Sequence, residues 1–349
     1  MDIILFGAGT TGRYILRDLR ARGTPPVAFA DNNFEKQGTK EEGLIVLSPE
    51  NAKALYPDAI WVASAIRPEL REEITEQLYL MGVQTVPVWD FLPKRYATSP
   101  PRAQQTLESL AGDRATISEF RDQMEFRKHP SERQAPPSDD REIYFPDFII
   151  RREDEHFVDC GAADGDTVQD FLKRYPKYAF ITALEPDPQQ FLKLKNSTAA
   201  VNNIRLIEKA VTDHCMGVTF DPLGDESAHV VTGHQSEGAD GSIFVKSCCL
   251  DNLDYPVGLV SPPTFIKMDI EGAEPEALWG AREIIKKYSP VLAICAYHEA
   301  EHFWTLPLLI HALNPEYKLF VRRYAYGTFE TVWYAVPPSR VNGCSCKPS

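Results

Sequence analysis

The stretch HFVDCGAADGDT, residues 156–167, joins a short apolar run to a glycine-broken turn and then to a helix. The helix is predicted because apolar side chains recur at the spacing of one helix face, at Val168, Phe171, Leu172 and Tyr175. Gly161 and Gly165 let the backbone approach a ligand that a Cβ would repel, and the amides near Thr167 at the helix start favour a carboxylate or phosphate. Asp159 adds an acid at the end of the strand, which suits an amine or sulfonium ligand.

A second acid is predicted at the end of the next strand. The apolar run 179–184 is followed by Glu185 and then by PDPQQFLKLK, which opens as a helix with an acid and proline in its first turn. In open α/β sheets the ligand lies beyond the carboxyl ends of the strands, and an acid after the second strand holds a ribose diol. Asp159 and Glu185 together therefore predict a site for S-adenosylmethionine, although each acid taken alone is more often a helix cap.

Length and composition bound the kind of protein. With 349 residues the chain is long for one hydrophobic core, which predicts two domains. The hydrophobic share of 43% without a long uncharged apolar run predicts a soluble protein with no membrane span. The opening MDIILFGAG is predicted to be a strand and not a signal peptide, and seven cysteines without a regular framework fit the cytoplasm. The net charge of −13 disfavours nucleic acid and favours a small-molecule acceptor.

A separate glycine pattern opens the chain. Gly7, Gly9 and Gly12 form G-x-G-x-x-G after a predicted strand, and Asp31 ends the next strand where the ribose acid of a dinucleotide site is expected. The GAGTTGR-like and FADNN-like segments resemble nucleotide-binding N-terminal domains of sugar-modifying enzymes. Residues 1–92 are predicted to be a small Rossmann-like, doubly wound domain. Binding of NAD or a nucleotide sugar and a purely structural use of the glycines remain alternatives.

The remaining segments connect or extend these two regions. Residues 93–139 are polar and rich in proline breaks, with two helix-like stretches, and are predicted to be a helical connector. The methyl-donor domain is assigned to residues 140–337, and residues 338–349 to a tail. Asp213 follows the third predicted strand of that domain, in the loop that would border an adenine.

Chemistry-bearing residues follow two later predicted strands. Asp269, Glu271 and Glu274 come at or after the run 265–270, and His298 follows the run 291–296. The acids are interpreted as groups that orient a substrate hydroxyl or a cation, against the alternative of a solvated loop; whether a metal binds is left open. His298 is a candidate general base because an imidazole can take a proton near neutral pH, with a packed histidine as the alternative.

With these motifs the sequence resembles the FkbM family of S-adenosylmethionine-dependent methyltransferases. The resemblance rests on VDCGAADGDT, ALEPDP, FIKMDIEGAEPEALWGA, AYH, YKLFVRRY and TVWYAV. It implies an α/β class I methyltransferase fold, with a seven-stranded sheet ending in an antiparallel hairpin, and methyl transfer to a hydroxyl, often on a sugar. By that analogy Asp159, Gly161, Gly165 and Glu185 would hold the cofactor, while Asp269, Glu271, Glu274 and His298 would face the acceptor.

Two rival functions remain open from the sequence. An NAD-dependent sugar-nucleotide oxidoreductase would use Gly7 to Asp31, although no Tyr-x-x-x-Lys pair supports it. A non-catalytic nucleotide-binding scaffold would keep a vestigial methyltransferase fold. Oligomeric state is not predicted.

Overall fold

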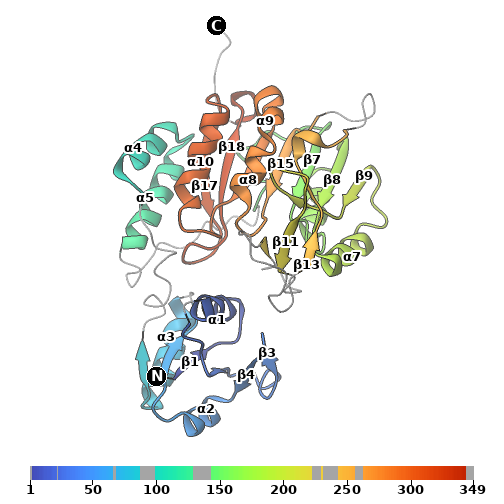
Figure 1. Cartoon of the computed structure of the whole chain (residues 1–349). Helices are drawn as coiled ribbons and strands as arrows, with labels where there is room; N and C mark the ends of the chain where they lie inside the picture. Colours follow the sequence, from blue (N-terminus) through green and yellow to red (C-terminus); the bar gives the residue numbers. More distant parts are fainter. Residues whose placement is uncertain are drawn as a thin grey trace. The chain divides into compact units, whose positions relative to one another are not determined.

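The computed structural model describes residues 2–21, 23–65, 68–86, 99–128, 143–221, 229–230, 243–255 and 262–342. The chain divides into two compact units (Figure 1). The first unit comprises Met1–Thr98, Asp122–Pro136 and Tyr326–Thr328, and the second comprises Ser99–Arg121, Pro137–Ala325 and Phe329–Ser349. The boundaries predicted at 92 and 139 fall outside the described residues. No helix in the described ranges combines the length and apolarity needed to cross a membrane.

The first unit is built on a six-stranded sheet in the order β3-β4-β2-β1-β5-β6. Its elements are β1 (Ile3–Phe6), α1 (Thr10–Ala21), β2 (Ala28–Ala30), β3 (Lys40–Glu41), β4 (Leu44–Leu47), α2 (Pro49–Leu55), β5 (Ile60–Ala63), α3 (Pro68–Leu80) and β6 (Gln84–Val86). β1 pairs in parallel with both β2 and β5, so the strand order reverses beside β1, as in the doubly wound arrangement predicted from the sequence. The short β3 and helix α2 were not predicted.

Two helices follow in the predicted connector. They are α4 (Pro101–Leu110) and α5 (Arg114–Lys128). α4 packs against α10 of the second unit, of which it is a part, and Gly112 donates a backbone hydrogen bond to Leu319. The first of the two connector helices therefore belongs to the core of the second unit.

The second unit contains a seven-stranded sheet in the order β17-β18-β16-β15-β7-β8-β9. Its sheet strands are β7 (His156–Cys160), β8 (Phe180–Leu184), β9 (Ile204–Ile207), β15 (Phe265–Met268), β16 (Val291–Cys295), β17 (Lys318–Arg323) and β18 (Thr331–Val336). The helices between them are α6 (Asp166–Arg174), α7 (Pro188–Ser197), α8 (Glu274–Trp279), α9 (Arg282–Tyr288) and α10 (His302–Leu313). β18 runs antiparallel to both neighbours, so the predicted sheet with a closing hairpin is confirmed.

Smaller elements fill the segment between β9 and β15. They are β10 (Ala210–Val211), β11 (Val218–Asp221), β12 (His229–Val230), β13 (Ile243–Val245), β14 (Ser247–Cys248) and the 3₁₀ turn η3 (Leu250–Asn252). β11 pairs with β12 and β13 in a small antiparallel sheet, and β10 pairs in parallel with β14.

The apolar residues Leu278, Ala281, Ile285 and Tyr288 recur at the spacing of one helix face, yet the structure has two helices there, α8 and α9. Two features lie at the break. A Cβ on Gly280 would lie 2.1 Å from the carbonyl oxygen of Thr212, which shows how closely the chain packs there. The carboxylate of Asp251 accepts hydrogen bonds from the amides of Glu283 and Ile284, which caps a new helix start.

The predicted tail begins inside the fold. A 3₁₀ turn, η4, spans Pro338–Arg340, and the guanidinium of Arg340 contacts both carboxylate oxygens of buried Glu155, at 3.1 and 2.8 Å. Residues 343–349 lie outside the described part of the chain. The segment up to residue 342 is thus packed on the second unit.

Candidate functional site

The glycine turn after β7 is required by packing within the chain. Gly161 has φ +78 and Gly165 has φ +93, both in the left-handed region that favours glycine. A Cβ on Gly161 would lie 1.9 Å from the carbonyl oxygen of Asp269, and one on Gly165 would lie 2.6 Å from Oγ of Ser197. Both glycines are predicted from the sequence to face a ligand; the contacts show an internal reason for them, and close approach of a ligand stays a prediction.

Glu185 follows β8 and holds this turn. Its Oε2 accepts a hydrogen bond of 2.9 Å from the amide of Ala163, and its Oε1 accepts one of 2.8 Å from the amide of Asp187. Burial raises the pKa of Glu185 to about 7, although the two amide hydrogen bonds act in the opposite direction. The acid predicted to bind a ribose therefore lies at the glycine turn and is largely buried.

Asp159 is fully buried on β7 beside an unpredicted lysine. β7 and β15 pair in parallel with Asp159 opposite Lys267, and Lys267 Nζ lies 3.1 Å from Asp159 Oδ1 and donates to the carbonyl of Gly161. Burial raises the pKa of Asp159 to about 6, against the lowering effect of Lys267. Lys267 pairs with Oδ1, whereas Oδ2 makes no hydrogen bond with any of the described residues, so one oxygen of this acid keeps acceptor capacity beside the turn.

Thr167 and Asp213, the other two residues predicted to hold the cofactor, differ in exposure. Thr167 is buried in the first turn of α6, and its amide donates to the side chain of Asp166. Asp213 is exposed after β10 and accepts a hydrogen bond from the hydroxyl of Thr212.

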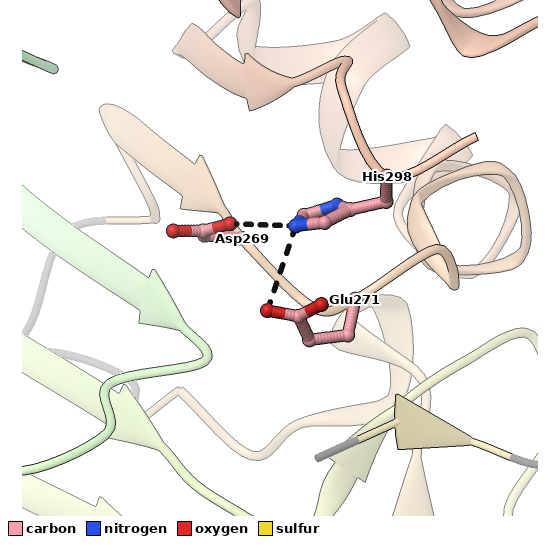
Figure 2. A group of neighbouring side chains, drawn as sticks. All are labelled: Asp269, Glu271 and His298. Atoms are coloured by element: carbon pink, nitrogen blue, oxygen red, sulfur yellow. Dashed lines mark ion pairs between the residues drawn. The ribbon is translucent and has the colours of Figure 1, made fainter. Parts of the chain in front are cut away.

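The four predicted acceptor-facing residues come together in one cluster. His298 Nδ1 lies 2.8 Å from Glu274 Oε1, while His298 Nε2 lies 3.2 Å from Asp269 Oδ1 and 3.6 Å from Glu271 Oε1. Figure 2 shows the imidazole reaching toward Asp269 and Glu271 through the same nitrogen. Residues 29 positions apart in the chain thus meet within hydrogen-bond distance.

The sheet explains why they meet. β15 and β16 pair in parallel, so Asp269 and His298 leave the sheet at the same edge. The chain then turns through Glu271, at φ +55, and Gly272, at φ +102. A non-glycine residue in this region is uncommon and costs free energy, which makes Glu271 a candidate functional position. α8 begins at Glu274, whose Oε1 accepts a hydrogen bond from the amide of Ile270.

The charges in the cluster are strongly coupled. Burial alone would raise the pKa of Asp269, but His298, Lys267 and a hydrogen bond from Tyr144 hold it well below its usual range. Burial likewise opposes ionisation of Glu274, but His298 and His302 lower its pKa to about 2. Burial would lower the pKa of His298, yet Glu271 and Glu274 raise it well above its usual value. The neighbouring carboxylates therefore favour the imidazolium form of His298, and its role as general base stays a prediction.

Several site residues were not predicted. Tyr144 donates to Asp269 Oδ2 at 2.8 Å, Tyr297 donates to Asp269 Oδ1 at 3.2 Å, and His302 Nδ1 lies 3.4 Å from Glu274 Oε2. Lys267 carried a signal, because a lysine inside the apolar run FIKM must be paired if it is buried. Tyr144 carried none, because it lies 125 residues from Asp269 in the chain.

The N-terminal glycine turn has its own acid. Asp31 Oδ2 accepts a 2.8 Å hydrogen bond from the amide of Ala8, and its Oδ1 accepts one of 2.8 Å from the amide of Asn33. Gly7 has φ +109, and a Cβ on Gly12 would lie 2.0 Å from the carbonyl oxygen of Gly7. Gly9 has no atom within 4 Å of its Cβ position. The structure thus brings Asp31 to the glycine turn as predicted. Of the three glycines, Gly9 alone has free space at its Cβ position.

The strand order of the second unit, with one reversed strand next to the sheet edge, defines a class I methyltransferase fold. The family model described as Methyltransferase FkbM domain matches residues 159–326, and the resemblance seen in the motifs is confirmed. A second family model, described as C2185-like, N-terminal, matches residues 1–86.

Known proteins similar to this chain agree with that assignment. The 2-O-methyltransferase NoeI of Sinorhizobium fredii (strain NBRC 101917 / NGR234) is 29% identical over 153 residues, which are 40% of this chain and 62% of NoeI. The match thus spans less than two thirds of that relative. The crystal structure of Methyltransferase FkbM from Methylobacillus flagellatus KT superimposes with a TM-score of 0.66 at 20% identity, over 96% of this chain and 89% of that one. At this identity the superposition shows a shared fold.

Proposed function

We propose that the chain is an S-adenosylmethionine-dependent O-methyltransferase that acts on a hydroxyl of a carbohydrate or a similar small molecule. The observation that carries the proposal is the buried Asp159 carboxylate beside the glycine turn, whose Oδ2 makes no hydrogen bond with the described residues although Lys267 pairs with Oδ1. The FkbM domain supports methyl transfer, and the 2-O-methyltransferase activity in the name of NoeI supports oxygen as the acceptor atom.

The residues around the turn fit the methyl donor. Asp159 suits its ammonium group, Glu185 suits the ribose hydroxyls, and Asp213 would border the adenine. Gly161, Gly165 and Thr167 would line the backbone side of the site. The donor supplies a methyl group already activated as a sulfonium, so the protein needs no nucleophilic side chain and contributes chiefly by positioning the two reactants.

The cluster around His298 would hold the acceptor. As the acceptor oxygen bonds to the methyl carbon, the carbon–sulfur bond breaks, its electron pair goes to sulfur, and the hydroxyl proton passes to a carboxylate. Asp269 and Glu271 are the candidates, because their side chains are 22% and 26% exposed whereas Glu274 is fully buried. His298 would orient both carboxylates instead of acting as the base.

The test uses the full chain. Calorimetry with S-adenosylmethionine and S-adenosylhomocysteine is expected to show saturable binding of both, and labelled methyl transfer is then followed with simple glycosides and nucleotide sugars. Glu271→Gln is expected to keep S-adenosylhomocysteine affinity and to lower methyl transfer by about tenfold or more. If neither compound binds the wild-type protein, the result favours the non-catalytic scaffold. An absorbance change on addition of NAD and a sugar nucleotide would favour the oxidoreductase.

For the N-terminal glycine turn, ligand binding and a purely structural use both stay predictions. The open space beside Gly9 is the observation that favours binding of NAD or a nucleotide sugar, whereas the close packing at Gly12 fits a structural use.

A further inference from the structure

Three side-chain atoms of the cluster converge in the way that ligands of a metal ion do. One carboxylate oxygen each of Asp269 and Glu271 and one ring nitrogen of His298 all lie within 4.8 Å of one another. Neighbouring ligands about 2.1 Å from an octahedral ion are about 3.0 Å apart. The distances from His298 Nε2 to Asp269 and Glu271, 3.2 and 3.6 Å, are close to that spacing (Figure 2).

The nitrogen at the centre of this group faces two carboxylates without an aligned hydrogen bond to either. His298 is 8% exposed, and its Nε2 makes no aligned hydrogen bond with any of the described residues, although both carboxylates are near. A buried polar nitrogen aimed between two carboxylates is the arrangement expected where an ion completes the geometry.

The surrounding residues form the outer contacts of such a site. Glu274 Oε1 accepts a hydrogen bond of 2.8 Å from His298 Nδ1. This contact fixes the ring and leaves Nε2 directed at Asp269 and Glu271. Tyr144 and Tyr297 each donate to Asp269 and orient its carboxylate. Metal-binding histidines commonly have their other nitrogen held by a carboxylate, and ligand carboxylates are commonly hydrogen-bonded in turn.

The charge balance also favours a cation. Three acids, Asp269, Glu271 and Glu274, lie around one imidazole, so the group carries excess negative charge, and a cation on His298 Nε2 takes the place of the imidazole proton. The buried ammonium of Lys267 contacts Asp159 and Gly161.

We propose that Asp269, Glu271 and His298 bind a divalent cation of the Mn²⁺ type at the carboxyl ends of β15 and β16. Two carboxylate oxygens with one imidazole nitrogen suit Mn²⁺, whereas Ca²⁺ takes oxygen ligands alone. Three protein ligands leave positions for oxygen atoms of water and of an acceptor. The binding itself does not depend on methyl transfer; its role rests on the proposed function.

That role concerns the acceptor hydroxyl. A carboxylate is a weak base toward an alcohol, and a bound cation lowers the pKa of an oxygen that coordinates it. An acceptor with two adjacent oxygens could fill two open positions, which would select its orientation as well.

The test is a titration of the full chain with Mn²⁺ in the absence of methyl donor, followed by electron paramagnetic resonance. The wild-type protein is expected to remove one equivalent of the free-ion signal, and the bound ion is expected to show coupling to an imidazole nitrogen. Glu271→Gln should weaken binding by about tenfold or more, because a charged ligand becomes neutral. Glu276→Gln, which changes an exposed acid of α8, is the matched control and should bind as the wild type does.

Three results would overturn the proposal. They are an undiminished free-ion signal with the wild-type protein, bound Mn²⁺ without nitrogen coupling, and equal binding by Glu271→Gln and Glu276→Gln. The nitrogen coupling needs no variant, so the test survives if Glu271→Gln fails to fold. Because the methyl donor is absent, bound Mn²⁺ together with failure to bind S-adenosylhomocysteine would defeat only the proposed function.

Discussion

The two units solve the same backbone problem in the same way. In each, an acid after the second strand accepts one hydrogen bond from the glycine turn and one from the amide two residues further on. In the first unit Asp31 accepts from Ala8 and Asn33. In the second unit Glu185 accepts from Ala163 and Asp187. An acid at this position is thus explained by support of the turn alone, before any ligand is considered.

The units differ at the end of the strand on the other side of the first strand. This strand is β5 beside β1 in the first unit and β15 beside β7 in the second. Ser64 comes directly after β5, and its amide donates to the carbonyl of Phe6 at the end of β1. Asp269 occupies the equivalent place after β15, where its amide donates to the carbonyl of Cys160 at the end of β7. A neutral serine thus stands where the second unit begins its charged cluster. The comparison indicates that the acid-supported glycine turn is a structural feature that both units share. The residues that could carry chemistry lie at the end of the adjacent strand, and they are charged in the second unit alone of the two compared positions.

The largest expected difference between the units is the loss of stability when a lysine beside an acid is removed. Lys267→Met should destabilise the second unit by about 3–5 kcal/mol, because it leaves Asp159 buried and unpaired. Lys36 Nζ lies 4.0 Å from Asp31, and the lysine side chain is 33% exposed. Lys36→Met should therefore lower the free energy of unfolding by only about 0–1 kcal/mol. Calorimetric unfolding of both variants measures the contrast. Equal losses would mean that burial does not distinguish the two pairs.

This contrast marks the limit of what the sequence could predict. Hydrophobic periodicity located the strands, and the rule that parallel strands end at one edge brought Asp269 and His298 together. The raised pKa of His298 was not predictable, because it depends on Glu271 and Glu274 lying around one ring. The internal need for Gly161 was equally hidden, because the atom that excludes a Cβ belongs to Asp269.

The two turn-supporting acids should differ in their effect on the methyl donor. Glu185→Ala is expected to weaken S-adenosylmethionine binding by about a hundredfold, through loss of charge-assisted hydrogen bonds. Asp31→Ala makes the same kind of change in the other unit and should leave that affinity unaltered. Calorimetry on both folded variants gives the answer, and an unchanged affinity in Glu185→Ala would remove the ribose assignment.

The pH dependence of binding should report the buried acid. The pKa of Glu185 is raised to about 7 from an ordinary value of 4.5, so the folded state binds more protons in this interval and loses stability as pH rises through it. Ribose hydroxyls donate to the ionised carboxylate, so affinity should rise about tenfold between pH 6 and pH 8. Glu185→Gln, titrated in parallel, removes this rise and corrects for ionisation of the ligand. Parallel curves would show that Glu185 does not titrate on binding.

The smallest expected effect separates the two uses of the N-terminal glycines. Gly9→Ala should change the free energy of unfolding by less than about 1 kcal/mol, because its Cβ position is open and its φ is not in the left-handed region. Gly12→Ala places a Cβ against the carbonyl of Gly7 and should destabilise the unit, which makes it the positive control. NAD and nucleotide-sugar binding is then measured on Gly9→Ala. If the wild-type protein binds one of them and the folded variant does not, the open side of the turn is a ligand site; if neither protein binds, the glycines serve packing alone, and the likeness between the units ends at the backbone.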